Sequence, residues 1–506
     1  MSDGKRFYIT TAIDYANGAP HMGHAIEKIG ADAMARYHRL RGEDVHFLMG
    51  MDEHGLKVLQ SAHAAGVSPQ AWVDDIAQQF THVWDRLGIS HDDFVRTTQA
   101  RHRPAVEAMI RRIADAEDLY VGRYEGWYCV GCEAFKRDDE LVRVDGVDAP
   151  RCPVHPKREV SWTEEENWFF RLSAYQDRLL ELLNERPGFI QPEARLNEIR
   201  NVIEGGLEDI SVSRSRLPWG IPWPGDEQHT VYVWLDALTN YLSAIGFPDE
   251  RYRDHWPADV HVVGKDITRF HCIYWPAFLM SADIELPQSV WAHGFVTIGG
   301  GKMSKSEGVH VELNEAIDRH GPDALRYFLL REIPWNSDGE FSYDRFDERY
   351  ASELADNFGN LASRSISMIE RYRAGLVPAG EPTRLDEEIV GALLRYRAAM
   401  DGQMLHQGLA VALMLSSSAN QYVDARAPWT QAKDPALAAE LDTTLAALAR
   451  CVAALGTLLQ PFMPGKMAEV ADRLGLERIA PLDEVATLDM TGRRVHRGEI
   501  LFPKVR

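Results

Sequence analysis

The chain has little cysteine and lacks long hydrophobic runs. Five cysteines among 506 residues are too few for a disulfide scaffold, and they favour a reducing cytoplasm. No apolar run approaches the length of a membrane span, and the first residues lack the apolar stretch of a signal peptide. We therefore expect no membrane association. We also find no internal repeat and no low-complexity tract, which excludes repeat architectures.

The chain also lacks an excess of positive charge. Its 55 Lys and Arg residues against 76 Asp and Glu residues give a net charge of −21. On a simple electrostatic argument this speaks against a nucleic-acid binder. An acidic protein still binds nucleic acid if its basic residues line one face, and we expect helical stretches at 195–216 and 364–373 to supply such residues. The length allows three or four domains with full-sized cores.

A short string near the start predicts a phosphate site. Pro20-His21-Met22-Gly23-His24 follows the apolar run 7–13, which indicates a buried strand. Pro20 suits the first position of a helix, and His21 and His24 then share one face of its first turn. The N–H groups and dipole of a helix N-terminus favour phosphate, and Gly23 lets a nucleotide approach the backbone.

A second string lies much later, at Lys302-Met303-Ser304-Lys305-Ser306 behind three glycines at 299–301. It offers two lysines on a loop that we expect to move. Taken alone, the first string is a chance surface feature about as often as a site, and the second is usually a solvated loop. Their order, separation and context together indicate one ATP site.

The order of predicted elements indicates an α/β fold with a doubly wound parallel sheet. Residues 1–116 alternate strands and helices, and residues 117–229 form an insertion. The αβ pattern resumes at 230–345, starting with a strand expected at 230–234. Residues 346–506 predict a bundle of long amphipathic helices.

The insertion contains paired metal-ligand spacings. Cys129-Val130-Gly131-Cys132 and Cys152-Pro153-Val154-His155 are separated by 19 residues. Three thiolates and one imidazole at these spacings suit tetrahedral Zn²⁺, with one ion per chain. Because protein fills all four positions, this zinc would be structural. Cys272 and Cys451 stand alone, and we expect them in the core.

The two signature strings resemble those of the class I aminoacyl-tRNA synthetases, which implies a Rossmann-like core that activates an amino acid with ATP and loads it onto tRNA. Over nearly the whole chain the sequence is similar to the methionine-specific members of that family. The strings that carry this likeness are 15–18 (Tyr-Ala-Asn-Gly), 52–55 (Asp-Glu-His-Gly), 234–237 (Trp-Leu-Asp-Ala), 264–266 (Gly-Lys-Asp) and 275–277 (Trp-Pro-Ala).

The resemblance implies a role for each matching residue. The catalytic residues would be His21, His24, Lys302 and Lys305. ATP, with Mg²⁺, would contact His21, Gly23, His24, Glu27, Gly264, Asp266 and Lys305. Methionine would lie among Ile13, Tyr15, Asp52, Trp234, Ala237, Leu238, Tyr241, Ile267 and His271, with Asp52 on the α-ammonium group. Aromatic and small side chains suit a thioether. Without the family match, the apolar stripe from Trp234 to Tyr241 would be interpreted as part of the core, and His271 as a structural histidine. The family pattern can have Pro where Leu238 stands.

In the helical part the resemblance places the anticodon of tRNA(Met), initiator and elongator, against Asn360, Arg364 and Trp429. Without it, helix-packing polar residues and a buried Trp would be the better interpretation. The chain stops soon after Phe502, without the additional domain that makes some members dimeric, so we expect a monomer.

Three other functions remain open at this point. A sister synthetase for isoleucine, valine or leucine usually has a large editing domain, for which the insertion is too small, and a cysteine enzyme is a further alternative. A non-catalytic tRNA-binding paralogue would be expected to have lost His21, His24 or Lys305. A small nucleotidyltransferase would not need the lysine loop, the cysteine pairs and the helical part together.

Overall fold

A seven-stranded parallel sheet forms the centre of the computed structural model. The structure describes residues 5–129, 134–136, 138–143, 149–153, 155–215, 217–298, 301–302 and 311–504. The strand order is β2-β3-β1-β14-β15-β9, and β4 pairs with β3. Every pair in this sheet is parallel, so the predicted α/β class is confirmed. The strands are β1 (Arg6–Thr11), β2 (Asp14–Tyr15), β3 (Asp44–Asp52), β4 (Asp93–Arg96), β9 (Ile190–Gln191), β14 (Val260–Gly264) and β15 (Val290–His293).

Both faces of this sheet are buried, which is what its nearly continuous apolar strands require. Alternate side chains of β1 enter different hydrophobic clusters: Phe7 and Ile9 pack into one and Tyr8 into the other. Helix α1 (Met22–Leu40) covers the first face together with α3 (Pro69–Arg86). Helices α4 (His102–Asp115), α8 (Asn240–Ser243) and α9 (Trp275–Ser281) contribute to the second cluster.

Most of the segment between the two halves of the sheet forms sheets of its own, but β9, which lies within the expected insertion, joins the parallel sheet beside β15. Strands β5 (Leu119–Cys129) and β8 (His155–Phe170) run antiparallel along their length. A separate three-stranded sheet contains β13 (Asp226–Val231) in its middle. The strand expected at 230–234 therefore does not rejoin the parallel sheet. The helix expected at 195–216 is also wrong in extent, since α6 (Glu193–Glu204) ends earlier and two strands follow, β10 (Ile210–Ser211) and β11 (Ser213–Ser215).

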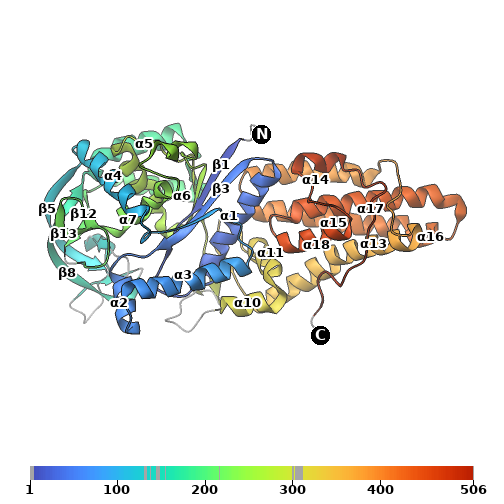
Figure 1. Ribbon diagram of the computed structural model, residues 1–506, viewed down its shortest axis with the longest axis horizontal. Helices are drawn as coiled ribbons and strands as arrows, with labels where there is room; N and C mark the ends of the chain where they lie inside the picture. Colours follow the sequence, from blue (N-terminus) through green and yellow to red (C-terminus); the bar gives the residue numbers. More distant parts are fainter. Residues whose placement is uncertain are drawn as a thin grey trace.

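The C-terminal part is an elongated bundle of helices that extends away from the sheet (Figure 1). A break at 374–383, which contains two glycines and two prolines, separates the first two of its long helices. The last described residues return to the base of the bundle, where the hydroxyl of Tyr350 donates to the carbonyl of Pro503 at 2.9 Å. The long helices are α13 (Asn360–Arg373), α14 (Arg384–Asp401), α15 (Leu405–Arg426), α17 (Ala438–Leu459) and α18 (Pro464–Arg473).

One helical segment of the bundle corrects an expectation from the sequence. Pro435–Leu459 is long and apolar enough to cross a membrane by length and composition alone. Its apolar window is 83% buried inside the protein. The helix is apolar because it lies in the core of the bundle, where other helices surround it.

Candidate active site

The N-terminus of α1 lies beyond the carboxyl end of β1, where ligands of open parallel sheets gather. His21 is the N-cap, so Pro20 precedes the helix rather than starting it. The Gly23 N–H donates to Nδ1 of His21 at 3.1 Å, and the His21 N–H donates to Nδ1 of His24 at 3.2 Å. Both Nδ1 atoms are therefore acceptors, and each ring carries its proton on Nε2. The two rings stack with centroids 3.7 Å apart.

A buried charge network lies directly behind this helix end. The ammonium group of Lys28 is 2.8 Å from Asp14 and 2.7 Å from Glu27, and it donates to the carbonyl of Ala12 at 2.8 Å. Two buried carboxylates thus share one cation. Burial raises the pKa of Asp14 to about 7 despite Lys28. Burial also acts to raise the pKa of Glu27, but Lys28 and His293 outweigh burial, and the pKa of Glu27 is lowered.

The same network joins α1 to the other half of the sheet. Nε2 of His293 lies 3.1 Å from Glu27, although the two residues are 266 positions apart. His293 at the end of β15 pairs in register with Gly264 at the end of β14. A Cβ on Gly264 would lie 2.8 Å from the carboxylate of Asp266, so glycine permits the close approach there. The structure therefore brings Glu27, Gly264 and Asp266 to one edge of the sheet.

The lysine string lies mainly beyond what the structure describes. Lys305 is outside the described residues, and for Lys302 only the backbone is described, in β17 (Gly301–Lys302). Strand β17 pairs with β16 (Val296–Ile298). Lys265 holds the segment that leads into β17. Its Nζ lies 4.5 Å from the ring centroid of Phe295, which directly precedes β16, and 2.7 Å from Asp338.

Aromatic side chains build an apolar site next to this edge. Trp234, on α7 (Val233–Leu238), stacks on Phe270 with centroids 3.7 Å apart. Nδ1 of His271 donates to the carbonyl of Ile267 at 3.0 Å, so its Nε2 accepts from the hydroxyl of Tyr241 at 2.7 Å. Burial lowers the pKa of His271 to about 4, and the ring is neutral at pH 7. Leu238 and Tyr241 belong to one hydrophobic cluster, against which Ile13, Trp234 and Ile267 also pack.

The two remaining residues predicted near the amino acid lie side by side. Tyr15 in β2 and Asp52 at the end of β3 are register partners. Asp52 is 8% exposed, so its carboxylate lies at a largely dehydrated strand end. A carboxylate in such a place is suited to an ammonium group.

Two of the predicted metal ligands meet in the antiparallel sheet. Cys129 and Cys152 are both fully buried and belong to one small cluster with Val160. The backbone of Cys152 pairs with that of His155. Cys132 and the side chain of His155 lie outside the described residues. These two buried thiols are half of the ligand set expected for zinc. Among the residues that the structure describes, no group of three or more His, Cys, Asp or Glu side chains is placed to hold a metal ion.

At the far end of the bundle, the structure brings together two of the three residues predicted to read the anticodon. The guanidinium carbon of Arg364 lies 5.9 Å from the ring centroid of Trp429, and its NH2 is 3.0 Å from Asp424. Trp429 is 41% exposed, so it is not the buried core residue that a packing role would require. Asn360 begins the same helix, one turn before Arg364, and is exposed.

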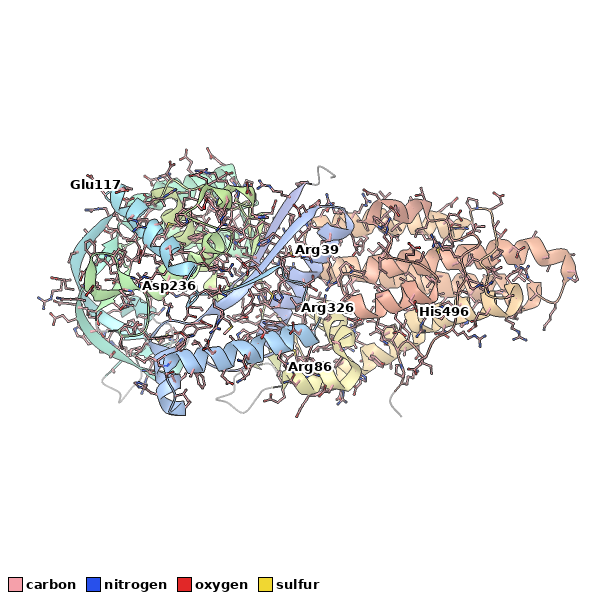
Figure 2. The ribbon with its side chains drawn as sticks, in the orientation of Figure 1. Arg39, Arg86, Glu117, Asp236, Arg326 and His496 are labelled. Atoms are coloured by element: carbon pink, nitrogen blue, oxygen red, sulfur yellow. The ribbon has the colours of Figure 1, made fainter. Side chains whose placement is uncertain are left out.

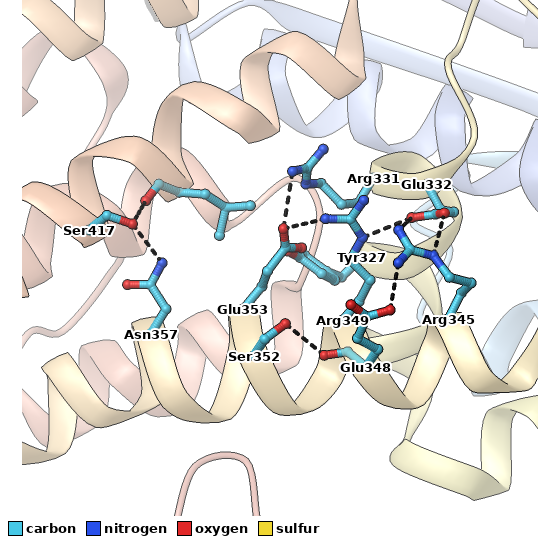
Figure 3. Close-up of polar contacts among 11 residues, drawn as sticks. Tyr327, Arg331, Glu332, Arg345, Glu348, Arg349, Ser352, Glu353, Asn357 and Ser417 are labelled. Atoms are coloured by element: carbon cyan, nitrogen blue, oxygen red, sulfur yellow. Dashed lines mark hydrogen bonds and ion pairs between the residues drawn. The ribbon is translucent and has the colours of Figure 1, made fainter.

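An ion network fixes the base of that helix. Glu353, in the π-helical segment η7 (Tyr350–Gly359), is 2.6 Å from Arg349 and 3.0 Å from Arg331 of α11 (Pro322–Glu332). One turn further along, the side-chain amide of Asn357 donates to Ser417 of α15 at 3.0 Å (Figure 3). These contacts set the direction in which α13 leaves the catalytic part.

Reasoning from the sequence missed two buried polar residues of this site. Lys28 and His293 were not singled out, although a Glu-Lys pair within an otherwise apolar helix was a usable signal.

A parallel sheet with a histidine-capped helix at its carboxyl edge and a C-terminal helical region defines a class I aminoacyl-tRNA synthetase. A family model described as "tRNA synthetases class I (M)" matches residues 7–153 and 140–366. A second, "Anticodon binding domain of methionyl tRNA ligase", matches residues 374–506. The chain belongs to the methionyl family of class I tRNA synthetases, which confirms the resemblance found in its motifs.

Individual relatives cover nearly the whole chain. A methionine–tRNA ligase of Caldanaerobacter subterraneus is 44% identical over 511 residues, covering 99% of this chain and 79% of the relative. That of Brucella suis is 46% identical over 483 residues, covering 93% and 92%. The solved methionyl-tRNA synthetase of Mycobacterium tuberculosis in complex with methionyl-adenylate is 43% identical, with a TM-score of 0.95 over 99% of this chain and 100% of that one.

Proposed function

We propose that this chain activates L-methionine with ATP and then transfers it to the 3′ end of tRNA(Met). This proposal rests on three features that lie at one edge of the sheet. They are the capped N-terminus of α1, the Glu27–His293 contact and the aromatic site around His271. The full-length similarity to methionine–tRNA ligases supports the same reaction.

In the first step, the methionine carboxylate attacks the α-phosphorus of ATP, and the bond to pyrophosphate breaks. In the second, a terminal ribose hydroxyl of the tRNA attacks the carbonyl carbon of the adenylate, and AMP leaves. Neither step needs a covalent intermediate on the protein, so positioning and charge stabilisation carry the catalysis. Mg²⁺ bound with ATP would neutralise charge on its phosphates.

Each group of residues then has a proposed task. His21 and His24 donate from Nε2–H to the phosphates, because capping occupies their Nδ1 atoms. Lys302 and Lys305 close over the leaving pyrophosphate. Gly23, Glu27, Gly264 and Asp266 hold the adenosine, with the two acidic residues on the ribose hydroxyls.

Methionine lies with its α-ammonium group on Asp52 and its thioether among the aromatic rings. His271 suits the thioether because it is neutral, and its tautomer is fixed by Ile267 and Tyr241. Trp234 is held by its stack on Phe270 and so presents a fixed wall. The other residues proposed to line this site are Ile13, Tyr15, Ala237 and Leu238.

We further propose a structural zinc ion on Cys129, Cys132, Cys152 and His155, which would stabilise the tip of the inserted segment. Asn360, Arg364 and Trp429 would read the anticodon of initiator and elongator tRNA(Met), with Trp429 stacked on an unpaired base. We divide the chain at residues 116, 229 and 345, and propose that it works as a cytoplasmic monomer.

The test is ATP–pyrophosphate exchange by the purified chain with each of the twenty amino acids. Exchange that depends on methionine alone is the expected result. Exchange with another amino acid would keep the class of enzyme and overturn the proposed pocket. Absence of exchange in folded protein with Mg²⁺, both with and without tRNA, would contradict the activity.

A further inference from the structure

Three buried side chains connect the loop after β3 to the helix that carries Trp234. Asp236 on α7 is fully buried, and Figure 2 labels it in the catalytic part of the chain. Its Oδ2 is 2.7 Å from Nδ1 of His54, and its Oδ1 is 2.7 Å from Nε2 of His102. One carboxylate is therefore held between two imidazoles from different elements.

Each end of this cluster is itself held. His102, at the start of α4, has its Nδ1 2.8 Å from the hydroxyl of Ser243 on α8. On the other side, the ring of Trp219 meets His54 edge-on with centroids 5.6 Å apart. The indole N–H of Trp219 donates to the carbonyl of Glu53 at 2.6 Å. The loop that follows Asp52 (the Asp52 loop) is thus fixed to α4, α7 and α8 through a single carboxylate.

The charges within the cluster are complementary. Burial acts to raise the pKa of Asp236, but His54 and His102 outweigh it and lower this pKa to about 2. Burial acts to lower the pKa of His54, and the charge of Asp236 outweighs it and raises that pKa. A hydrogen bond to an ionised, desolvated carboxylate such as that of Asp236 is shorter and stronger than one between neutral groups.

We propose that Asp236, acting through His54 and His102, is a positioning residue that sets the distance between the Asp52 loop and α7 and thereby determines the affinity for methionine. This inference rests on the proposed function, in which Asp52 binds the α-ammonium group and Trp234 faces the thioether. Asp236 lies two residues after Trp234, and His54 lies two residues after Asp52. The cluster therefore connects the two halves of the methionine site without touching the substrate.

The test is a set of variants measured by ATP–pyrophosphate exchange. Asp236→Asn keeps the shape and removes the charge, and we expect the KM for methionine to rise roughly tenfold or more, as small misplacements of binding groups do. The KM for ATP changes by less than about twofold, because the ATP groups lie on α1 and β14. Asp226→Asn is the matched control: it also removes a carboxylate paired with a histidine, His229 at 2.8 Å, and leaves both KM values unchanged.

A double-variant cycle separates positioning from general destabilisation. In an Asp52→Ala background, Asp236→Asn adds little further loss, because the group it positions is already gone. If Asp236→Asn does not fold, two single variants replace it: His54→Asn keeps a donor near the Nδ1 position and retains affinity, and His54→Leu loses it.

Three results would overturn the inference: Asp236→Asn behaving as Asp226→Asn does, full additivity with Asp52→Ala, or equal losses in His54→Asn and His54→Leu. A wild-type chain without methionine-dependent exchange would instead contradict the proposed function itself. The two failures are therefore distinguishable.

Discussion

A buried ion pair at the junction of the catalytic part and the helical bundle predicts a large loss of stability on substitution. Arg326 of α11 is fully buried, and Figure 2 labels it at this junction. Its NH2 is 2.7 Å from Oδ2 of Asp32 on α1 and 2.8 Å from the carbonyl of Pro461. Its Nε and NH1 donate to the carbonyls of Phe462 and Leu87 at 3.1 and 3.3 Å. One guanidinium group thus joins three separate parts of the chain.

The substitution Arg326→Met keeps most of the volume and removes every donor. Asp32 retains Arg36 at 2.7 Å and the N–H of Ser90 at 2.7 Å, but three buried carbonyls lose a partner. Removing one member of a buried pair costs about 3–5 kcal/mol, and the contacts that Asp32 retains place the cost near the lower limit. At about 2–4 °C per kcal/mol for units of 150–250 residues, a loss of about 3 kcal/mol lowers Tm by roughly 6–12 °C.

The assay is thermal unfolding followed by circular dichroism, with Arg111→Met as the control. Arg111 has a 60% exposed side chain that lies 3.9 Å from Glu107. Exposed pairs of this kind contribute less than about 1 kcal/mol, so Tm should hardly move. If Arg326→Met shifts Tm no more than Arg111→Met does, the buried pair does not stabilise the junction and the argument is wrong.

Three further predictions concern other parts of the chain. Burial raises the pKa of Asp14 to about 7, so the contribution of this residue to stability is present below about pH 4 and is lost as the pH rises through 7. The Tm of the wild type should therefore fall between pH 5 and 8. An equal fall of Tm with pH in Asp14→Asn would contradict this. Trp429→Ala should lower kcat/KM for tRNA roughly 5- to 150-fold, as loss of a stacked base does, with methionine-dependent exchange unchanged; normal charging of tRNA would count against an anticodon role. Elemental analysis should find one zinc per chain in the wild type and in Cys451→Ala, which alters a buried thiol in the helical bundle, and none in Cys152→Ala. Zinc retained in both variants would rule out Cys152 as a ligand.

Local sequence patterns were sufficient for the parts of the fold that depend on near neighbours. The apolar run at 7–13 predicted β1, because strands buried on both faces must be apolar throughout. The break before α14 contains two glycines and two prolines, which disfavour a helix. The signature strings at the ends of these elements indicated the family, and the family models confirm it.

Local sequence patterns gave incomplete or wrong predictions where contacts with distant residues decided the structure. The run at 230–234 is apolar and β-branched like a strand of the parallel sheet, but β13 ends at Val231. This strand pairs with β11 (Ser213–Ser215) and β12 (Pro222–Trp223) instead. Pro20 is compatible with a first helical position, and the side chain of His21 caps the helix one residue later. In the segment 435–459, an apolar composition alone does not distinguish a membrane span from the buried helix that the bundle surrounds.

The sequence by itself determined which chemical groups this protein has and the order in which they lie along the chain. The tertiary structure alone decided which of them meet. His293 reaches Glu27 across 266 positions, and His54 reaches Asp236 across 182. The spacing of residues along one element specifies which side chains share its face, but it carries no information about the element packed against that face. Contacts between distant segments form only when the chain folds around the sheet and buries polar groups. Each buried polar group must then find a partner.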